Sequence, residues 1–211
     1  MRHRRKGRTL GRSPSHQRAL LRNLTIALLL TERDAEDDEN APKVKGRIIT
    51  TLEKAKEVRP LVEKCITIAR RSLPAQREAD QFATTADRYS AEWKEWRQGS
   101  EWSEWSRAIA PVLAARRRVL RLLSGSGRRD GEGHKQAVRI LFDEIAPRFE
   151  QRAGGYTRIL RLAKPRLGDA GTRAVLEFVG VHDRDIRRAE APRFEGPEEP
   201  ALPASGSQPN E

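Results

Sequence analysis

The amino terminus carries residues whose chemistry suits a polyanion. Positions 1–12 contain six basic residues and no acidic one, and the first acid in the chain is Glu32. The six are Arg2, Arg4, Arg5, Lys6, Arg8 and Arg12. Each Lys or Arg beside a phosphate releases condensed counterions, which adds about 0.7–0.9 to the slope of log affinity against log salt. Arginine also forms planar two-point hydrogen bonds and stacks on exposed bases. This pattern favours an arm that contacts nucleic acid; the alternative is a disordered tail that only improves solubility.

Other residues capable of chemistry lack the spacing that a catalytic or metal site needs. The four histidines, at positions 3, 16, 134 and 182, are not spaced as metal ligands, and we interpret His3 and His16 as hydrogen-bonding or stacking groups near phosphate. Asp143 and Glu144 are adjacent, and adjacent helical positions point about 100° apart, so the two carboxylates do not converge on a substrate. The single cysteine, Cys65, excludes an internal disulfide and a CxxC metal knuckle. We therefore expect no enzyme activity, no cofactor and no metal site.

The bulk composition indicates one domain with charged appendages. The 211 residues are 36% hydrophobic and 34% charged, whereas a typical globular domain is about 45–50% apolar and about 25% charged. The formal net charge of +12, from 42 Lys plus Arg against 30 Asp plus Glu, creates a field that attracts polyanions such as nucleic acid. An anionic membrane surface is the rival partner.

Little in the sequence indicates that the protein binds or spans a membrane. The longest apolar run, Ile26–Leu30, is far shorter than the roughly 20 residues that span a bilayer. The basic start is not followed by a long apolar segment with a cleavage site, so the sequence shows no signal peptide. We expect a cytoplasmic protein with no membrane partner and no small-molecule substrate.

A first helix is expected to continue the charge of the arm. Ser13 is a favourable N-cap and Pro14 suits the first helical position. Arg18 and Arg22 lie four residues apart and off the apolar face. That face is predicted to consist of Leu20, Leu21, Leu24, Ala27, Leu28 and Thr31. The acidic residues within 34–45 then predict a solvated loop.

A short strand and a long helix follow. The strand is expected at Arg47–Thr50. Thr50 and Glu53 have the spacing of a capping box, which predicts a helix from there to about Ser72. Pro60 predicts a kink or a restart just before it. The buried face of this helix is predicted to be Ala55, Val58, Leu61, Val62, Cys65, Ile66 and Ala69.

The segment 73–131 holds four tryptophans in two similar pairs. Helices are expected at 88–98 and 101–123, and residues 124–131 have the composition of a flexible linker. The pairs are Trp93/Trp96 and Trp102/Trp105, and because each pair is three apart, it can share a helix face. Either the rings pack together as a small added core, or they contact RNA or a neighbouring protein, since Trp favours interfaces.

A helix and a hairpin are expected in the carboxyl-terminal half. The helix begins near position 134 and should end at Pro147. Strands at Tyr156–Leu162 and Thr172–Val179 should form an antiparallel hairpin with a long loop. Tyr156 is either a core aromatic or a residue that stacks on RNA. From Ala189 onward, Pro, Gly and acidic residues predict disorder.

Four blocks of sequence carry more specific information. They are MRHRRKGRTLGRSPSHQRALLRNL (1–24), ITTLEKAKEVRPLVEKCITIA (49–69), LFDEIAPRF (141–149) and GGYTRILRL (154–162), the last followed by a strand ending AVLEFV (174–179). In this order they resemble the seventeenth family of bacterial large-subunit ribosomal proteins. The resemblance implies an α/β (α+β) fold with helices packed on a small three-stranded sheet. It also implies a structural protein bound to large-subunit (23S) rRNA near the rim of the peptide exit tunnel, beside neighbouring ribosomal proteins, with no catalysis and no cofactor.

The resemblance implies RNA-binding residues position by position. The arm contributes Arg2, His3, Arg4, Lys6, Arg8 and Arg12, to which its composition adds Arg5. The first helix contributes His16, Arg18 and Arg22, and the domain contributes Arg59, Tyr156 and Arg158. Residues 114–123 resemble the family's basic helix, which adds Arg116 and Arg117.

The chain departs from the family pattern in three places. The acidic run 34–45 and the Trp-containing segment look like insertions, and the tail is longer than the family requires. The expected organisation is a basic RNA-binding arm at 1–12, a single ribosomal-protein domain at 13–73 and 111–182, a helical insertion at 74–110 and a disordered tail at 183–211.

Two alternatives stand beside a structural ribosomal protein. A free RNA-binding factor of ribosome assembly or regulation would reuse the same domain. An enzyme acting on RNA would need a phosphate-cradling loop, a metal constellation or a convergent acid–base set, and the sequence shows none of these.

Overall fold

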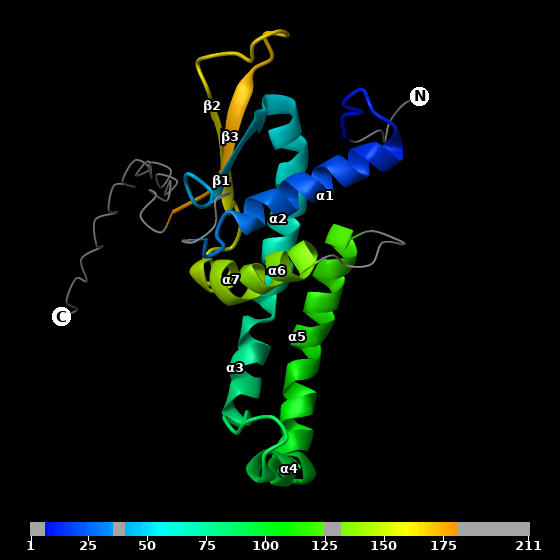
Figure 1. The fold of residues 1–211 in the computed structure, drawn as a ribbon, viewed down its shortest axis with the longest axis vertical. Coiled ribbons are helices and arrows are strands. Elements are labelled where there is room, and N and C mark those ends of the chain that lie inside the picture. The colour runs from blue at the N-terminus through cyan, green and yellow to red at the C-terminus, as the bar shows by residue number, and fades with distance from the viewer. Residues whose placement is uncertain (1–6, 36–40, 125–131, 181–211) are drawn as a thin grey trace, which may run out of the picture. The chain divides into compact units, whose positions relative to one another are not determined.

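The computed structural model describes residues 7–35, 41–124 and 132–180 (Figure 1). The chain divides into two units, Met1–Val181 and His182–Glu211, and the second lies outside the described residues. The predicted tail, most of the predicted linker and the centre of the acidic loop fall outside them as well. The described elements are α1 (Pro14–Leu30), β1 (Arg47–Thr51), α2 (Leu52–Arg71), α3 (Leu73–Gln81), α4 (Ala91–Gln98), α5 (Ser100–Ser124), α6 (Glu132–Ile140), the π-helix η1 (Leu141–Ile145), α7 (Ala146–Arg148), β2 (Thr157–Arg161) and β3 (Arg173–Phe178).

The three strands form one antiparallel sheet in the order β1-β3-β2. In the central strand, Leu176 lies opposite Ile48 of β1 and Ile159 of β2. α2 contacts all three strands, and alternate residues of β3, including Ala174 and Leu176, are fully buried in the core. The predicted fold class of helices packed on a small three-stranded sheet is confirmed, as are the predicted strand and hairpin.

α2 is the central helix of the core. Its predicted apolar face is confirmed, because six of the seven residues are buried and Leu61 is partly buried against the core. Of the kink or restart predicted just before Pro60, the restart is wrong, since one helix runs from Leu52 to Arg71, and the kink stays a prediction. The predicted capping box is wrong too. Thr50 belongs to β1, and the N-cap is Thr51, whose side chain makes no capping hydrogen bond.

α1 begins as predicted, with Ser13 as the N-cap and its hydroxyl accepting a hydrogen bond from the His16 amide. The buried face differs by part of a turn from the predicted one. Thr25 and Leu29 are buried with Leu28, whereas Ala27 is exposed. A buried threonine was not expected there. Its hydroxyl donates to the carbonyl of Leu21 at 2.9 Å, which satisfies the polar group inside the core.

The predicted end of a helix at Pro147 is wrong. α6, η1 and α7 follow one another without a gap from Glu132 to Arg148. In η1 the amide of Ala146 donates to the carbonyl of Leu141, five residues earlier, so the helix widens by one residue just before the proline. Proline has no amide to donate, and a widened turn accommodates it inside the helix.

The segment after α2 is helical throughout most of its length. α3 was not predicted, because Ser72 and Pro74 interrupt the apolar periodicity; in the structure this proline occupies the first turn of α3, where it is tolerated. α4 and α5 were predicted, with the break at Gly99. α3 and α5 lie side by side, and α4 packs on the beginning of α5 (Figure 1).

The tryptophan rings pack against one another at this end of α5. The ring centroids of Trp96, Trp102 and Trp105 are 5.0–5.7 Å apart. Arg97 lies over the rings of Trp93 and Trp102, at 5.0 Å from each centroid. The four rings are only half-buried. Of the two interpretations of the tryptophans, the packed cluster is therefore present in the structure.

An ion pair between the buried carboxylate of Glu32 and the partly exposed side chain of Arg148 ties the end of α1 to α7. Arg148 donates to both carboxylate oxygens of Glu32, at 2.9 and 3.1 Å, and Glu32 is only 7% exposed. Hydrogen bonding to this carboxylate raises the pKa of Arg148 above its ordinary value. Gly46 packs against the same carboxylate, and its amide donates to the hydroxyl of Thr31 at 3.1 Å. The end of α1 and the start of β1 are fixed by this cluster.

Replacing Gly46 by alanine is expected to lower the free energy of unfolding by about 1–3 kcal/mol. Gly46 has φ +74°, and a Cβ there would lie 2.9 Å from Oε1 of Glu32, displacing the carboxylate from Arg148. Chemical denaturation of both proteins measures the difference. Gly133→Ala is the control, because a Cβ there meets no atom within 4 Å and alanine favours a helix. Equal losses in the two variants would contradict the explanation.

The thiol of Cys65 is expected to be unreactive in the folded protein. Burial in the core raises the pKa of Cys65 to about 12, against an ordinary value of 9.0. Because the thiolate is the reactive species, labelling with Ellman's reagent at pH 8 should be slow in buffer and fast in guanidinium chloride. Similar rates under the two conditions would show that α2 does not bury this residue as described.

Candidate nucleic-acid interface

The described part of the basic arm is held against α1 and α2. The side-chain amide of Gln17 donates to the carbonyl of Arg8. Nε of Arg8 lies 3.5 Å from Oε1 of Glu57 on α2. The described end of the arm is therefore not a free tail, because α1 and α2 supply partners for Arg8. The remaining predicted arm residues, Arg2, His3, Arg4, Arg5 and Lys6, lie outside the described residues.

α1 carries further basic residues on from the arm. Nη1 of Arg12 donates to Nε2 of His16 at 3.0 Å, which requires the neutral imidazole with its proton on Nδ1. Arg18 is exposed and Arg22 is half-buried. Neither side chain forms a hydrogen bond or ion pair with any other residue that the structure describes. The structure thus leaves both guanidinium groups available to an anion.

A groove of about 400 Å³ between α2 and β2 gathers four cations. Lys56 and Arg59 come from α2, and Arg158 and Arg161 come from β2. The other lining residues are Leu52, Thr157 and Ile159, so no acidic residue lines this α2–β2 groove. Side-chain cations around an apolar floor provide charge for phosphate and a surface for sugar or base.

Two carboxylates lie near the groove and neutralise part of its charge. Nε of Arg59 is 3.7 Å from Oε1 of Glu63, and Nε of Arg158 is 2.5 Å from Oε1 of Glu177. Both arginine side chains are nearly half exposed, and such surface pairs contribute only about 0–1 kcal/mol. A phosphate can therefore compete for either guanidinium, and the side chains of Lys56 and Arg161 have no carboxylate partner among the described residues.

Glu63 also fixes the geometry of the groove. Its Oε2 accepts from the amides of Gly155 and Tyr156 at 3.1 and 3.2 Å. Its Oε1 accepts from the amide and the hydroxyl of Thr157 at 3.0 and 2.8 Å. These four bonds attach the start of β2 to α2, which places the cations of the strand beside those of the helix. Sequence reasoning missed Glu63, since its partners lie more than 90 positions away.

Two predicted RNA-binding residues do not suit that role. The expectation that Tyr156 stacks on RNA is wrong, because the residue is fully buried and packs against the ring of Phe149. Arg116 donates to Asp143 at 3.0 Å, and its guanidinium lies over the ring of Phe142. The side chain of Arg116 therefore forms contacts within the fold. Arg117, its neighbour on α5, is exposed.

The structure adds two cations that sequence reasoning did not select, Lys56 and Arg161. Lys56 lies three positions before Arg59, so the helical repeat places both on one face of α2 and was the available signal. Arg158 and Arg161 are three apart in β2, and strict strand alternation assigns them to opposite faces. Only the three-dimensional structure shows that both line the same groove.

The described residues, 7–35, 41–124 and 132–180, hold neither a metal-ligand cluster nor a bilayer-spanning helix. No group of three or more His, Cys, Asp or Glu side chains in that part of the chain is arranged to hold a metal ion. Within the same ranges, each helix is too short or too polar to cross a bilayer.

Comparisons with known proteins agree with the earlier resemblance. The family model described as Ribosomal protein L17 matches residues 20–179. The large ribosomal subunit protein bL17 of Rhodopirellula baltica is 60% identical over 213 residues, covering 100% of this chain and 97% of the relative. The bL17 proteins of Maridesulfovibrio salexigens and Lactobacillus helveticus are 32% and 33% identical. These alignments cover 99% and 82% of this chain, and 99% and 98% of the relatives. This chain therefore belongs to the ribosomal protein L17 family.

Proposed function

We propose that this protein is a structural constituent of the bacterial large ribosomal subunit and that it binds large-subunit rRNA through the arm, α1 and the α2–β2 groove. The observation that carries the proposal is the α2–β2 groove, where four cations from two elements meet without an acidic lining residue. Family membership supports the subunit as the place of binding. A structural protein of this kind acts by binding rRNA and holding its shape, so the proposed function needs no cofactor and no substrate.

The arm and the groove act from neighbouring positions on α2. Arg8 is paired with Glu57, one residue after Lys56 of the groove. Residues 1–6 precede this attachment point in the sequence and carry four more basic side chains. Basic residues that precede a fixed anchor lose less conformational entropy when they bind, because the anchor already restricts their conformations. We propose that they enter the RNA while the groove holds its backbone.

The family resemblance supports a more specific placement. We propose that the protein lies near the outer rim of the peptide exit tunnel, beside neighbouring large-subunit proteins, in the bacterial cytoplasm. The predicted RNA contacts that the structure leaves accessible are Arg8, Arg12, His16, Arg18, Arg22, Arg59, Arg117 and Arg158. Lys56 and Arg161 join them from the groove.

The protein is expected to co-sediment with the large subunit in stoichiometric amount. Sucrose-gradient fractions of a native lysate, analysed by quantitative mass spectrometry, measure this. A protein found only in the soluble fraction would overturn the proposal. A substoichiometric amount confined to precursor particles would assign it instead to ribosome assembly.

Removing charge from the α2–β2 groove is expected to flatten the salt dependence of rRNA binding. In Lys56→Gln/Arg161→Gln, the slope of log affinity against log salt should fall by about 1.4–1.8, because two phosphate contacts are lost. Fluorescence anisotropy with labelled, protein-free large-subunit rRNA measures the slope. Arg107→Gln/Lys135→Gln is the control of equal net charge, since both residues are exposed and lie outside the groove. Equal slopes for the two double variants would remove the groove from the interface.

A further inference from the structure

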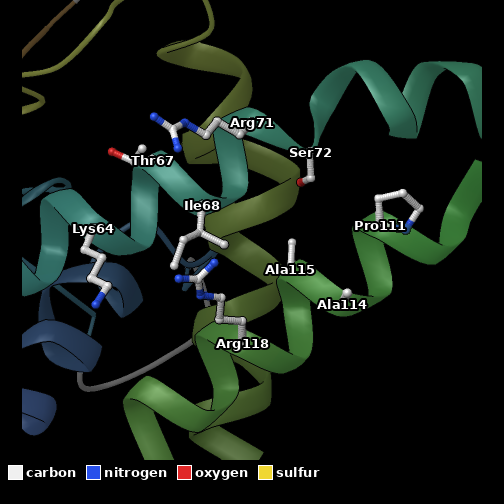
Figure 2. A pocket seen from close by; sticks show the side chains of 9 residues that line it. All are labelled: Lys64, Thr67, Ile68, Arg71, Ser72, Pro111, Ala114, Ala115 and Arg118. Carbon is white, nitrogen blue, oxygen red and sulfur yellow. The ribbon is translucent and has the colours of Figure 1, made fainter.

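A second and larger groove separates α2 from α5. Its volume is about 610 Å³, and its side chains are shown in Figure 2. From α2 it takes Lys64, Thr67, Ile68 and Arg71, and from α5 it takes Pro111, Ala114, Ala115 and Arg118. Both sets have the spacing i, i+3, i+4, i+7, so each is one continuous stripe of its helix. Two stripes that face one another along their length form this α2–α5 groove.

The hollow exists because α5 contributes small side chains. Pro111, Ala114 and Ala115 do not fill the space opposite Ile68, which is left half-buried. Ala114 of α5 is exposed although it lines the groove between α2 and α5. The floor of the groove is therefore apolar and open to a ligand group of moderate size.

Three cations rim this floor and are not used by the fold. Lys64, Arg71 and Arg118 are exposed, and none of their side chains has a hydrogen bond or ion pair with another residue that the structure describes. No acidic residue lines the groove. Figure 2 shows Arg118 reaching from α5 toward α2. Other arginines of the same region behave differently: Arg77, for example, is paired with Glu150.

We propose that the α2–α5 groove binds a backbone segment of large-subunit rRNA, a second contact beyond the arm and the α2–β2 groove. Lys64, Arg71 and Arg118 hold its phosphates, and a ribose or base edge covers the apolar floor. The hydroxyl of Thr67 donates to the carbonyl of Glu63 at 2.8 Å, so its oxygen keeps lone pairs that accept from a ribose 2′-hydroxyl. The inference rests on the proposed function, which supplies rRNA as the partner.

Helical walls favour RNA over an acidic peptide as the occupant. An extended peptide is held largely by main-chain hydrogen bonds. Apart from the helix ends and the turns before Pro60 and Pro111, the backbone groups of α2 and α5 are bonded within their helices, so the groove offers mostly side chains. Phosphates need only side-chain donors, and phosphate alternating with sugar matches a rim of cations around an apolar floor.

The full-length triple variant Lys64→Gln/Arg71→Gln/Arg118→Gln tests the charge of the groove. With labelled, protein-free large-subunit rRNA, the slope of log affinity against log salt should fall by about 2.1–2.7, and affinity at 0.1 M salt should fall on the order of 100-fold. The control triple Lys94→Gln/Arg107→Gln/Lys135→Gln has the same net charge and lines neither groove. A slope equal to that of the control would overturn the proposal.

Ala114→Leu tests the floor without changing charge. Ala114 is exposed, so the variant should keep the wild-type circular dichroism spectrum and melting temperature while binding rRNA more weakly. Unchanged rRNA affinity in this folded variant would contradict occupation of the groove.

The outcomes separate this proposal from the one on which it rests. Wild-type protein that fails to bind rRNA would overturn both. Wild-type binding that is weakened by Lys56→Gln/Arg161→Gln but not by the groove triple would overturn only the second contact. If the triple variant loses binding to poly-L-glutamate and keeps its rRNA slope, the groove serves an acidic protein segment and the RNA assignment is wrong.

Discussion

The carboxylate of Glu63 accepts four hydrogen bonds from the start of β2, and the attachment of the sheet to α2 depends on them. Hydrogen bonds to a charged group contribute about 1.5–3 kcal/mol each, more than a surface ion pair does. Because α2 is also the central helix of the core, this one carboxylate connects the interior to the basic surface. It sets where Arg158 and Arg161 lie relative to Lys56, so the geometry of the proposed interface depends on hydrogen bonds within the fold.

The chain has a net charge of +12, so its acidic residues can pair with only some of its basic residues. The position of each carboxylate determines which cations form contacts within the fold. Glu32 accepts two hydrogen bonds from Arg148, and Asp143 accepts one from Arg116. These arginines have planar, directed hydrogen bonds to partners far away in the sequence. Where no carboxylate faces them, as along the α2–α5 groove, the cations stay exposed. The proposed binding surface includes these exposed cations and also Arg59 and Arg158, whose ion pairs are solvent-exposed.

The sequence predicted elements whose signals are local and missed features that depend on distant partners. Ser13 and Pro14 mark the start of α1, and apolar periodicity marks the buried face of α2. The end expected at Pro147 was wrong because a π turn, visible only in the backbone, admits the proline. Arg116 and Arg117 are adjacent and equally basic, yet tertiary contacts alone separate the one bonded to Asp143 from the exposed one.

The contacts of the tryptophan cluster give α3, α4 and α5 a mechanical role. The indole nitrogen of Trp96 donates to the carbonyl of Phe82 at 3.0 Å, which links α4 to the end of α3. Trp96 also packs on Trp102 and Trp105 of α5, so three elements meet at one set of rings. α3 follows α2 directly and runs along α5. The cluster therefore braces the first turns of the same helix that, further along, forms a wall of the α2–α5 groove. Because a helix is rigid, fixing the first turns of α5 also fixes the turns that line the groove. Side chains that touch no ligand can therefore still set the width of a binding groove.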